Sequence, residues 1–173
     1  MDRSEYRILV SGPPGVGKTT LIRKVAADLA HRRPVGFYTA EIRERGARKG
    51  FELVSLDGRR GLLSHVDISG PHRVGKYGVD VEGFDRFLDT IQWPGPGTGL
   101  VMIDEIGKME CFSQRFRSLV RRILDSGTRV LATVARQGSG LIAEVKQRPD
   151  VELLGLTTRN RDSVAGEIVR RFA

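Results

Sequence analysis

The chain contains 173 residues, of which 29% are charged and 39% hydrophobic, values that are ordinary for a globular protein in water. A chain of this length fits one domain, so we expect residues 1–173 to form a single domain with its own core. The formal net charge of +8 favours anionic partners, either a polyphosphate or nucleic acid. No apolar run approaches the length of a transmembrane helix, which argues against a membrane protein.

The cysteine content and the N-terminus indicate the compartment. Cys111 is the one cysteine of the sequence, so an intramolecular disulfide is excluded. Asp2, Arg3 and Glu5 precede only a very short apolar stretch, which is not the pattern of a signal peptide. We therefore expect a cytoplasmic protein. We also expect it to be a monomer.

A phosphate-binding motif lies near the start of the chain. Residues 6–10 predict a short strand, and residues 11–20 then match G-x-x-x-x-G-K-[S/T], the P-loop. Apolar residues recur at helical spacing over residues 21–30, so a helix follows the loop. Strand, glycine-rich loop and helix in this order form the setting in which the motif binds phosphate. The predicted nucleotide-binding residues here are Gly12, Pro13, Pro14, Gly15, Val16, Gly17, Lys18, Thr19 and Thr20.

Phosphate chemistry explains the residue types of this motif. Glycines let the backbone turn tightly, so that successive N–H groups point at phosphate oxygens. Lys18 supplies a mobile positive charge for the β- and γ-phosphates, and we expect it to be catalytic. The Thr19 hydroxyl is a suitable ligand for Mg²⁺. The N-terminus of the following helix adds free donors and a partial positive charge.

The middle of the chain predicts antiparallel strands and loops. A strand over residues 35–40, a polar segment over 41–50 and a strand over 51–56 indicate a β-hairpin. Residues 57–80 are rich in glycine and short in periodicity, so we expect loops with brief strands. A short helix over residues 84–91 ends before the Pro- and Gly-rich loop 94–99.

The second half alternates between strands and helices, which predicts a parallel sheet covered on both faces. The expected elements are a buried strand over residues 100–103, a helix over 112–123, a strand over 130–134, a weaker helix over 141–145, a strand over 151–156 and a final helix over 164–172. The fold class is therefore α/β, a three-layer sandwich with a mostly parallel sheet. The hairpin at residues 35–56 would add antiparallel strands at one end.

Two carboxylates directly follow the buried strand over residues 100–103. Ligands of such sheets bind at the carboxyl ends of the strands, where the P-loop would also lie. We expect Asp104 to hold Mg²⁺ through water, opposite Thr19. Glu105 is placed to orient the water that attacks the γ-phosphorus. Lys108, just beyond them, is a further candidate catalytic residue near the γ-phosphate.

The segments Gly12–Ile22 and Asp104–Glu110 resemble the small P-loop nucleoside-triphosphatase family, which has archaeal and bacterial members and includes a human cancer-related NTPase. Shorter matches at residues 36–39, 73–77 and 160–161 extend the resemblance over nearly the whole chain. The resemblance implies a P-loop fold of the catalytic-Glu class, with an additional strand between the P-loop strand and the strand that ends in Asp104. It also implies a second nucleotide-binding segment formed by Leu100, Val101, Met102, Ile103, Asp104, Glu105, Ile106 and Gly107.

The activity that the resemblance implies is slow, Mg²⁺-dependent hydrolysis of ATP, GTP, CTP and UTP to the diphosphate and phosphate. Low base specificity agrees with the residues, because a P-loop binds phosphates only and the sequence lacks the guanine-binding pattern Asn-Lys-x-Asp. Arg161 follows the strand over residues 151–156, and we expect it to lie along the face of the nucleobase.

Two other functions stay open. A P-loop kinase for nucleotides or small molecules shares the motif, although the segment with Arg136, Lys146 and Arg148 is short for a lid. A nucleotide-regulated RNA-binding protein would use the positive charge. Nucleic acid is not the favoured partner, because the arginines are scattered and no aromatic residues alternate with them.

Overall fold

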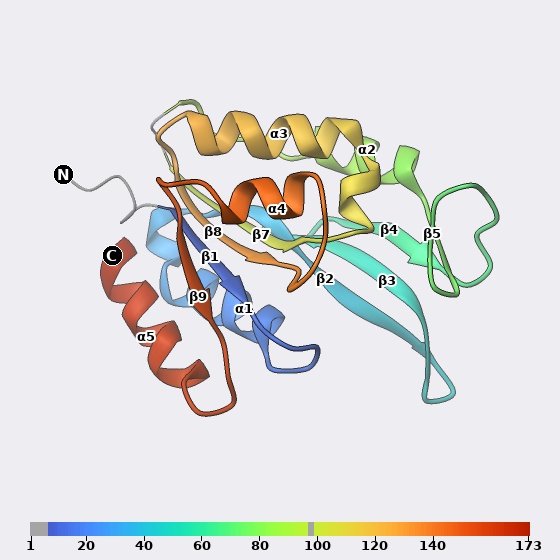
Figure 1. Cartoon of the computed structure of the whole chain (residues 1–173), viewed down its shortest axis with the longest axis horizontal. Helices are drawn as coiled ribbons and strands as arrows, with labels where there is room; N and C mark the ends of the chain where they lie inside the picture. Colours follow the sequence, from blue (N-terminus) through green and yellow to red (C-terminus); the bar gives the residue numbers. More distant parts are fainter. Residues whose placement is uncertain (1–6, 97–98) are drawn as a thin grey trace.

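The computed structural model describes residues 7–96 and 99–173. These residues form a nine-stranded sheet in the order β5-β6-β4-β3-β2-β7-β8-β1-β9 (Figure 1). The strands are β1 (Arg7–Ser11), β2 (Val35–Glu44), β3 (Ala47–Ser55), β4 (Arg60–His65), β5 (Arg73–Val74), β6 (Tyr77–Val79), β7 (Leu100–Ile106), β8 (Arg129–Val134) and β9 (Glu152–Gly155). The α-helices are α1 (Lys18–Asp28), α2 (Val81–Thr90), α3 (Gln114–Asp125), α4 (Leu141–Lys146) and α5 (Arg161–Phe172).

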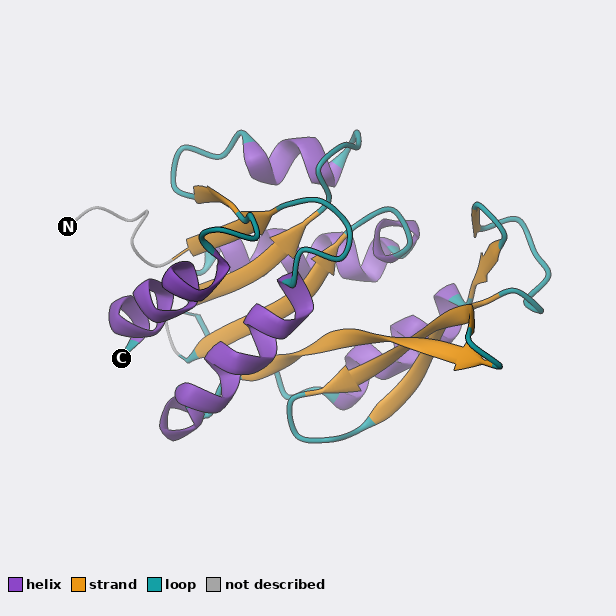
Figure 2. Cartoon of the chain, turned by 90° about the horizontal axis from the view of Figure 1, so that it is seen from below, coloured by secondary structure: helices purple, strands orange, loops and turns teal. Residues whose placement is uncertain are grey.

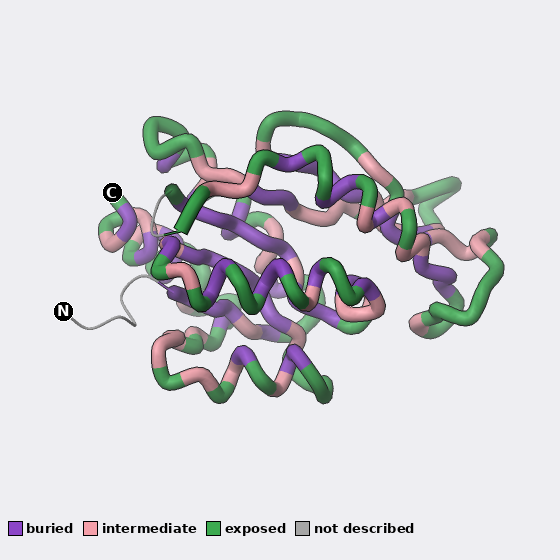
Figure 3. Tube along the Cα trace, turned by 90° about the horizontal axis from the view of Figure 1, so that it is seen from above, coloured by how far each residue is buried: buried purple, intermediate pink, exposed green. Residues whose placement is uncertain are grey.

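One half of the sheet is parallel and is covered on both faces. Strands β2, β7, β8, β1 and β9 pair in parallel in that order. Helices α1 and α5 lie on one face, and α3 and α4 lie on the other (Figures 1 and 2). Alternation within β1 explains this arrangement, because Ile8 and Val10 pack in the cluster of α1 and α5 while Leu9 packs in the opposite cluster. The three central parallel strands, β7, β8 and β1, are largely buried, and the helices alternate between buried and exposed positions (Figure 3).

The other half of the sheet is antiparallel and larger than the sequence indicates. Strands β3, β4, β6 and β5 continue the sheet beyond β2 through antiparallel pairs. The sheet is therefore mixed, and the expectation of a mostly parallel sheet is wrong. Close backbone approach is the reason, since a Cβ at Gly50 would overlap the Ser64 carbonyl and a Cβ at Gly78 would overlap that of Ile68. Gly50 thus allows β3 to lie close to β4, and Gly78 allows β6 to lie close to the loop that follows β4, although glycines in the sequence suggest loops.

The turn between β2 and β3 is also shorter than the predicted polar segment 41–50. Strand β2 continues to Glu44 and β3 begins at Ala47, so only Arg45 and Gly46 form the turn. Both have positive φ, 49° and 78°, as a two-residue hairpin turn of type I′ requires. The long strands that result extend away from the parallel half, at the right of Figure 1.

Strand β8 lies between β1, which precedes the P-loop, and β7. Strand β7 continues to Ile106, three residues beyond the predicted strand, and so includes both Asp104 and Glu105.

Two sequence predictions fall partly outside the described residues, namely Tyr6 of the first strand and Gly97 and Thr98 of the loop 94–99. Within the described ranges, no helix has the length and apolar character needed to cross a membrane.

Candidate active site

The P-loop connects the carboxyl end of β1 to the N-terminus of α1. Gly12 must be small, because a Cβ there would lie 2.8 Å from the Leu156 carbonyl oxygen. Gly17 is the N-cap of α1 and has φ of 108°, a conformation that favours glycine. No side chain caps this helix and no acidic residue lies in its first turn. The N–H groups at the start of α1 can therefore bind an anion.

Lys18 and Thr19 extend from the first turn of α1 toward the end of β7. The Lys18 ammonium donates to the Gly12 carbonyl over 2.9 Å and lies 3.4 Å from Glu105 Oε2. The Thr19 hydroxyl donates to Asp104 Oδ2 over 2.6 Å. The structure thus brings two predicted pairs of neighbours together, Lys18 with Thr19 and Asp104 with Glu105. The two pairs are separated by about 85 positions in the sequence.

Asp104 is 2% exposed and is held by three elements. Besides Thr19, the hydroxyl of Thr133 on β8 donates to its Oδ1 over 2.6 Å, and the Thr39 amide on β2 approaches its Oδ2 at 3.5 Å. Sequence reasoning missed Thr133. The available signal was a polar residue within the apolar strand 130–134, which in a buried position needs a hydrogen-bond partner.

The paired oxygens of Thr19 and Asp104 fit Mg²⁺, which prefers hard oxygen ligands and keeps several waters. Over residues 7–96 and 99–173, no group of three His, Cys, Asp or Glu side chains forms a protein-only metal cage. One hydroxyl, one carboxylate and the phosphates of a nucleotide could together hold such an ion.

The carboxyl groups of Glu105 and Glu110 both approach Gly107. A Cβ at Gly107 would be 2.8 Å from Glu105 Oε1 and 2.9 Å from Glu110 Oε2. Burial raises the pKa of Glu105. The Lys18 ammonium opposes this rise, and the negative charge of Asp104 adds to it. Burial, with the charge of Glu105 in second place, raises the pKa of Glu110 to about 8.

These groups face a cavity of about 380 Å³ that begins at the P-loop. One end is formed by Pro14, Gly15, Lys18 and Thr19 with the acidic residues of β7. The remaining wall comes from the antiparallel half of the sheet and the segment after β7, and it includes the apolar residues Phe51, Leu63, Val74 and Met109. No motif in the sequence predicts this wall.

The other predicted site residues divide into four groups. Lys108 is exposed and lines the cavity. The Arg161 guanidinium lies 3.4 Å from the Val16 carbonyl oxygen and packs beside Gly17, outside this cavity. Of the P-loop residues, Pro13 and Thr20 are exposed and Val16 is buried. The structure does not bring five apolar residues of β7 to the cavity, because their side chains lie in the two hydrophobic clusters: Leu100, Val101, Met102, Ile103 and Ile106.

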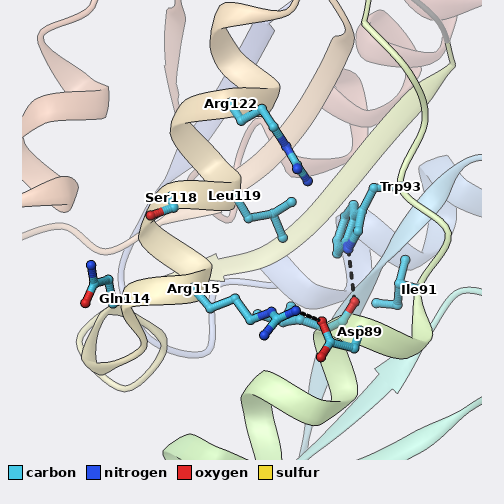
Figure 4. Close-up of a pocket in the computed structure, with 9 residues that line it drawn as sticks. Asp89, Ile91, Trp93, Gln114, Arg115, Ser118, Leu119 and Arg122 are labelled. Atoms are coloured by element: carbon cyan, nitrogen blue, oxygen red, sulfur yellow. Dashed lines mark hydrogen bonds and ion pairs between the residues drawn. The ribbon is translucent and has the colours of Figure 1, made fainter.

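A larger pocket, of about 640 Å³, lies between α2 and α3 (Figure 4). Its wall includes Trp93, whose indole donates to the Leu88 carbonyl, and Arg115, which pairs with Asp89. None of its lining residues belongs to the P-loop or to β7. The groups suited to phosphate chemistry are therefore in the smaller cavity.

Comparison with known proteins agrees with this geometry. The family model described as NTPase matches residues 7–169. The chain is 41% identical to the nucleoside-triphosphatase THEP1 of Thermotoga sp. (strain RQ2), over 94% of this chain and 93% of that protein. It is 42% identical to the human cancer-related nucleoside-triphosphatase, over 94% of each chain. It is also similar to the crystal structure of THEP1 from Aquifex aeolicus, with a TM-score of 0.81 and 34% identity over 94% of this chain and 96% of that one. The chain belongs to the NTPase family.

Proposed function

We propose that this chain is a Mg²⁺-dependent nucleoside-triphosphatase that hydrolyses ATP, GTP, CTP and UTP to the diphosphate and phosphate with low base specificity. The observation that carries the proposal is the position of Glu105, whose carboxylate lies 3.4 Å from the P-loop lysine at the end of the cavity. A carboxylate in that position can orient water toward the γ-phosphorus.

The P-loop supplies the binding interactions. Backbone N–H groups at the start of α1 and the Lys18 ammonium would contact the β- and γ-phosphates. Thr19 and Asp104 would hold Mg²⁺, with Thr133 fixing the orientation of the Asp104 carboxylate. When bound, the metal neutralises charge that develops on the phosphate oxygens. Lys108, exposed at the cavity, would add a second positive charge near the γ-phosphate.

Hydrolysis then requires a nucleophile and a group that accepts its proton. Glu105 would hydrogen-bond the attacking water and accept its proton as the bond to phosphorus forms. Its neighbour Lys18 would stabilise the charge on the departing diphosphate. A catalytic glutamate directly after the metal-binding aspartate, together with β8 between β1 and β7, supports assignment to the additional-strand class of P-loop proteins.

Base recognition would be weak. Arg161 lies against the P-loop at Val16 and Gly17 and is not among the residues that line the cavity. Its planar guanidinium could stack there on any nucleobase. Stacking depends on the aromatic face that all bases share, so it does not select among them.

Phosphate release from each of the four nucleotides, with Mg²⁺ and with EDTA in its place, tests the proposal. We expect release from all four with Mg²⁺ and only background release with EDTA. No release above background from any nucleotide would contradict it.

A further inference from the structure

We propose that the cavity beside the P-loop is an acceptor site, which binds a small uncharged molecule with an aromatic ring and a hydroxyl group, and that the chain transfers the γ-phosphoryl group to this hydroxyl. The inference rests on the proposed nucleotide chemistry of the same site. It adds a second substrate that can take the place of water.

The size of the cavity is the first argument. A water molecule takes up only about 30 Å³, whereas the cavity measures about 380 Å³. The nucleotide would occupy the end formed by the P-loop, where Lys18 and Thr19 lie. The rest of the cavity extends from Glu105 to strands β3, β4 and β5, and hydrolysis of the nucleotide does not require that space.

Much of the wall of that remaining space is apolar. Phe51 packs edge-on against Tyr77 at 5.6 Å, and the Arg48 guanidinium covers the Phe51 ring at 5.3 Å. Leu63 is 1% exposed and is therefore fixed by the core. Val74 and Met109 complete the apolar surface. An apolar wall with an aromatic ring suits the ring of a small organic ligand rather than water or phosphate.

The charges around the cavity favour an uncharged molecule. Arg48 is neutralised by Glu41 over 3.1 Å and also donates to the Tyr77 hydroxyl over 2.9 Å. Glu105 and Glu110 add two carboxyl groups at the boundary with the P-loop end. An anionic acceptor placed next to the triphosphate would be repelled by it.

The transfer step uses the groups already assigned to hydrolysis. The hydroxyl of the acceptor would lie at Glu105, between the apolar wall and the γ-phosphate. Its O–H bond breaks and the proton passes to the Glu105 carboxylate, while the oxygen forms a bond to the γ-phosphorus. The bond from that phosphorus to the β–γ bridging oxygen breaks, and its electron pair leaves with the diphosphate. The products are a phosphate monoester and the nucleoside diphosphate.

The test measures ester formation and phosphate release together, with γ-labelled ATP and Mg²⁺. The probes are benzyl alcohol, 2-phenylethanol, uridine and adenosine, which all combine an aromatic ring with an uncharged hydroxyl. We expect a labelled monoester with at least one probe, in an amount that saturates with probe concentration, at the expense of free phosphate. Phosphate release with no ester from any probe would overturn the acceptor site and leave the hydrolytic function intact. Failure to hydrolyse ATP at all would instead contradict the proposed function.

Two tryptophan variants test whether the ester forms in this cavity. Val74 lies on the short edge strand β5, so a larger residue there can fill the cavity with little change to the sheet. We expect Val74→Trp to lower the ratio of ester to free phosphate at least about tenfold, because the added ring occupies the apolar space. Leu62→Trp is the matched control, since Leu62 on β4 is 38% exposed and is not among the residues that line the cavity. An equal ratio in the two variants would show that the ester does not form in this cavity.

Discussion

The Lys18 ammonium lies 3.4 Å from the Glu105 carboxylate and 2.9 Å from the Gly12 carbonyl, so one cation contacts both the P-loop and the end of β7. Burial raises the pKa of Glu105, and the charge of Lys18 opposes that effect. Lys18 therefore stabilises the ionised form of the group that would accept a proton. Lys18 and Glu105 therefore act on each other, and substitution of either residue should lower hydrolysis for a different reason.

Lys18→Ala should reduce hydrolysis of ATP by at least about 100-fold, because the phosphates lose the cation that stabilises the transition state. Phosphate release under saturating ATP measures the effect. Lys24→Ala is the matched control, since Lys24 is exposed on the same helix and pairs only with Asp28 among the described residues. Hydrolysis near the parent rate in Lys18→Ala would contradict the assignment of the P-loop.

Glu105→Gln should retain nucleotide and Mg²⁺ binding and lose turnover by about 10²–10⁴-fold, the usual contribution of general-base catalysis. The amide keeps the size of the side chain but cannot accept the proton. Single-turnover hydrolysis and nucleotide affinity, measured in parallel, separate the two effects. Glu167→Gln on α5 is an exposed control. If Glu105→Gln hydrolyses ATP within about threefold of the parent, Glu110 or Glu41 becomes the candidate base.

Thr133→Val should weaken the apparent affinity for Mg²⁺ and so raise the Mg²⁺ concentration needed for half-maximal hydrolysis, because Asp104 Oδ1 loses the donor that orients it. The buried oxygen left without its partner should also cost about 1–3 kcal/mol of folding stability. Thr128→Val controls for stability alone, since Thr128 is also buried but bonds to Ser126. An unchanged Mg²⁺ requirement in Thr133→Val would show that this hydrogen bond serves stability only.

Glu110→Gln should remove a dependence of folding stability on pH. Burial and the charge of Glu105 raise the pKa of Glu110 to about 8 in the folded chain, against an ordinary value of 4.5. The folded state therefore binds a proton that the unfolded state has released, so this contribution is complete below pH 4.5 and is lost as the pH rises through about 8.

Urea unfolding at about pH 6 and about pH 9 measures this difference. We expect Glu110→Gln to be more stable relative to the parent at the higher pH than at the lower one. Glu82→Gln, at a 92% exposed side chain on α2, should show no such change. Parallel pH profiles for the parent and Glu110→Gln would contradict the raised pKa.

Arg161→Ala should raise KM for all four nucleotides by a similar factor of about 2–30, the range expected for a cation–π contact. The kcat/KM values for ATP and GTP should differ by less than about 100-fold in the parent and in the variant. Arg170→Ala, exposed on the same helix, is the matched control. A loss confined to one base would show that Arg161 selects among nucleotides.

The sequence by itself determined the P-loop, the carboxylates after the buried strand and the alternation of strands and helices in the second half. These features depend on spacing along a short segment, as in Gly12, Gly17 and Lys18, or on the periodicity of apolar residues. Such local patterns can be recognised without knowledge of the tertiary structure. The apolar run over residues 100–103 in this way predicted that Asp104 and Glu105 lie at the end of a strand.

Only the tertiary structure decided which distant residues complete the cavity. Thr133 reaches Asp104 because β8 pairs with β7 in a register that aligns Ala132 with Ile103. The apolar wall exists because β3 pairs closely with β4 at Gly50 and because β6 pairs with β4, with Gly78 against the loop residue Ile68. These pairings join segments far apart in the chain, and a glycine that permits close backbone contact looks the same in sequence as a glycine in a loop.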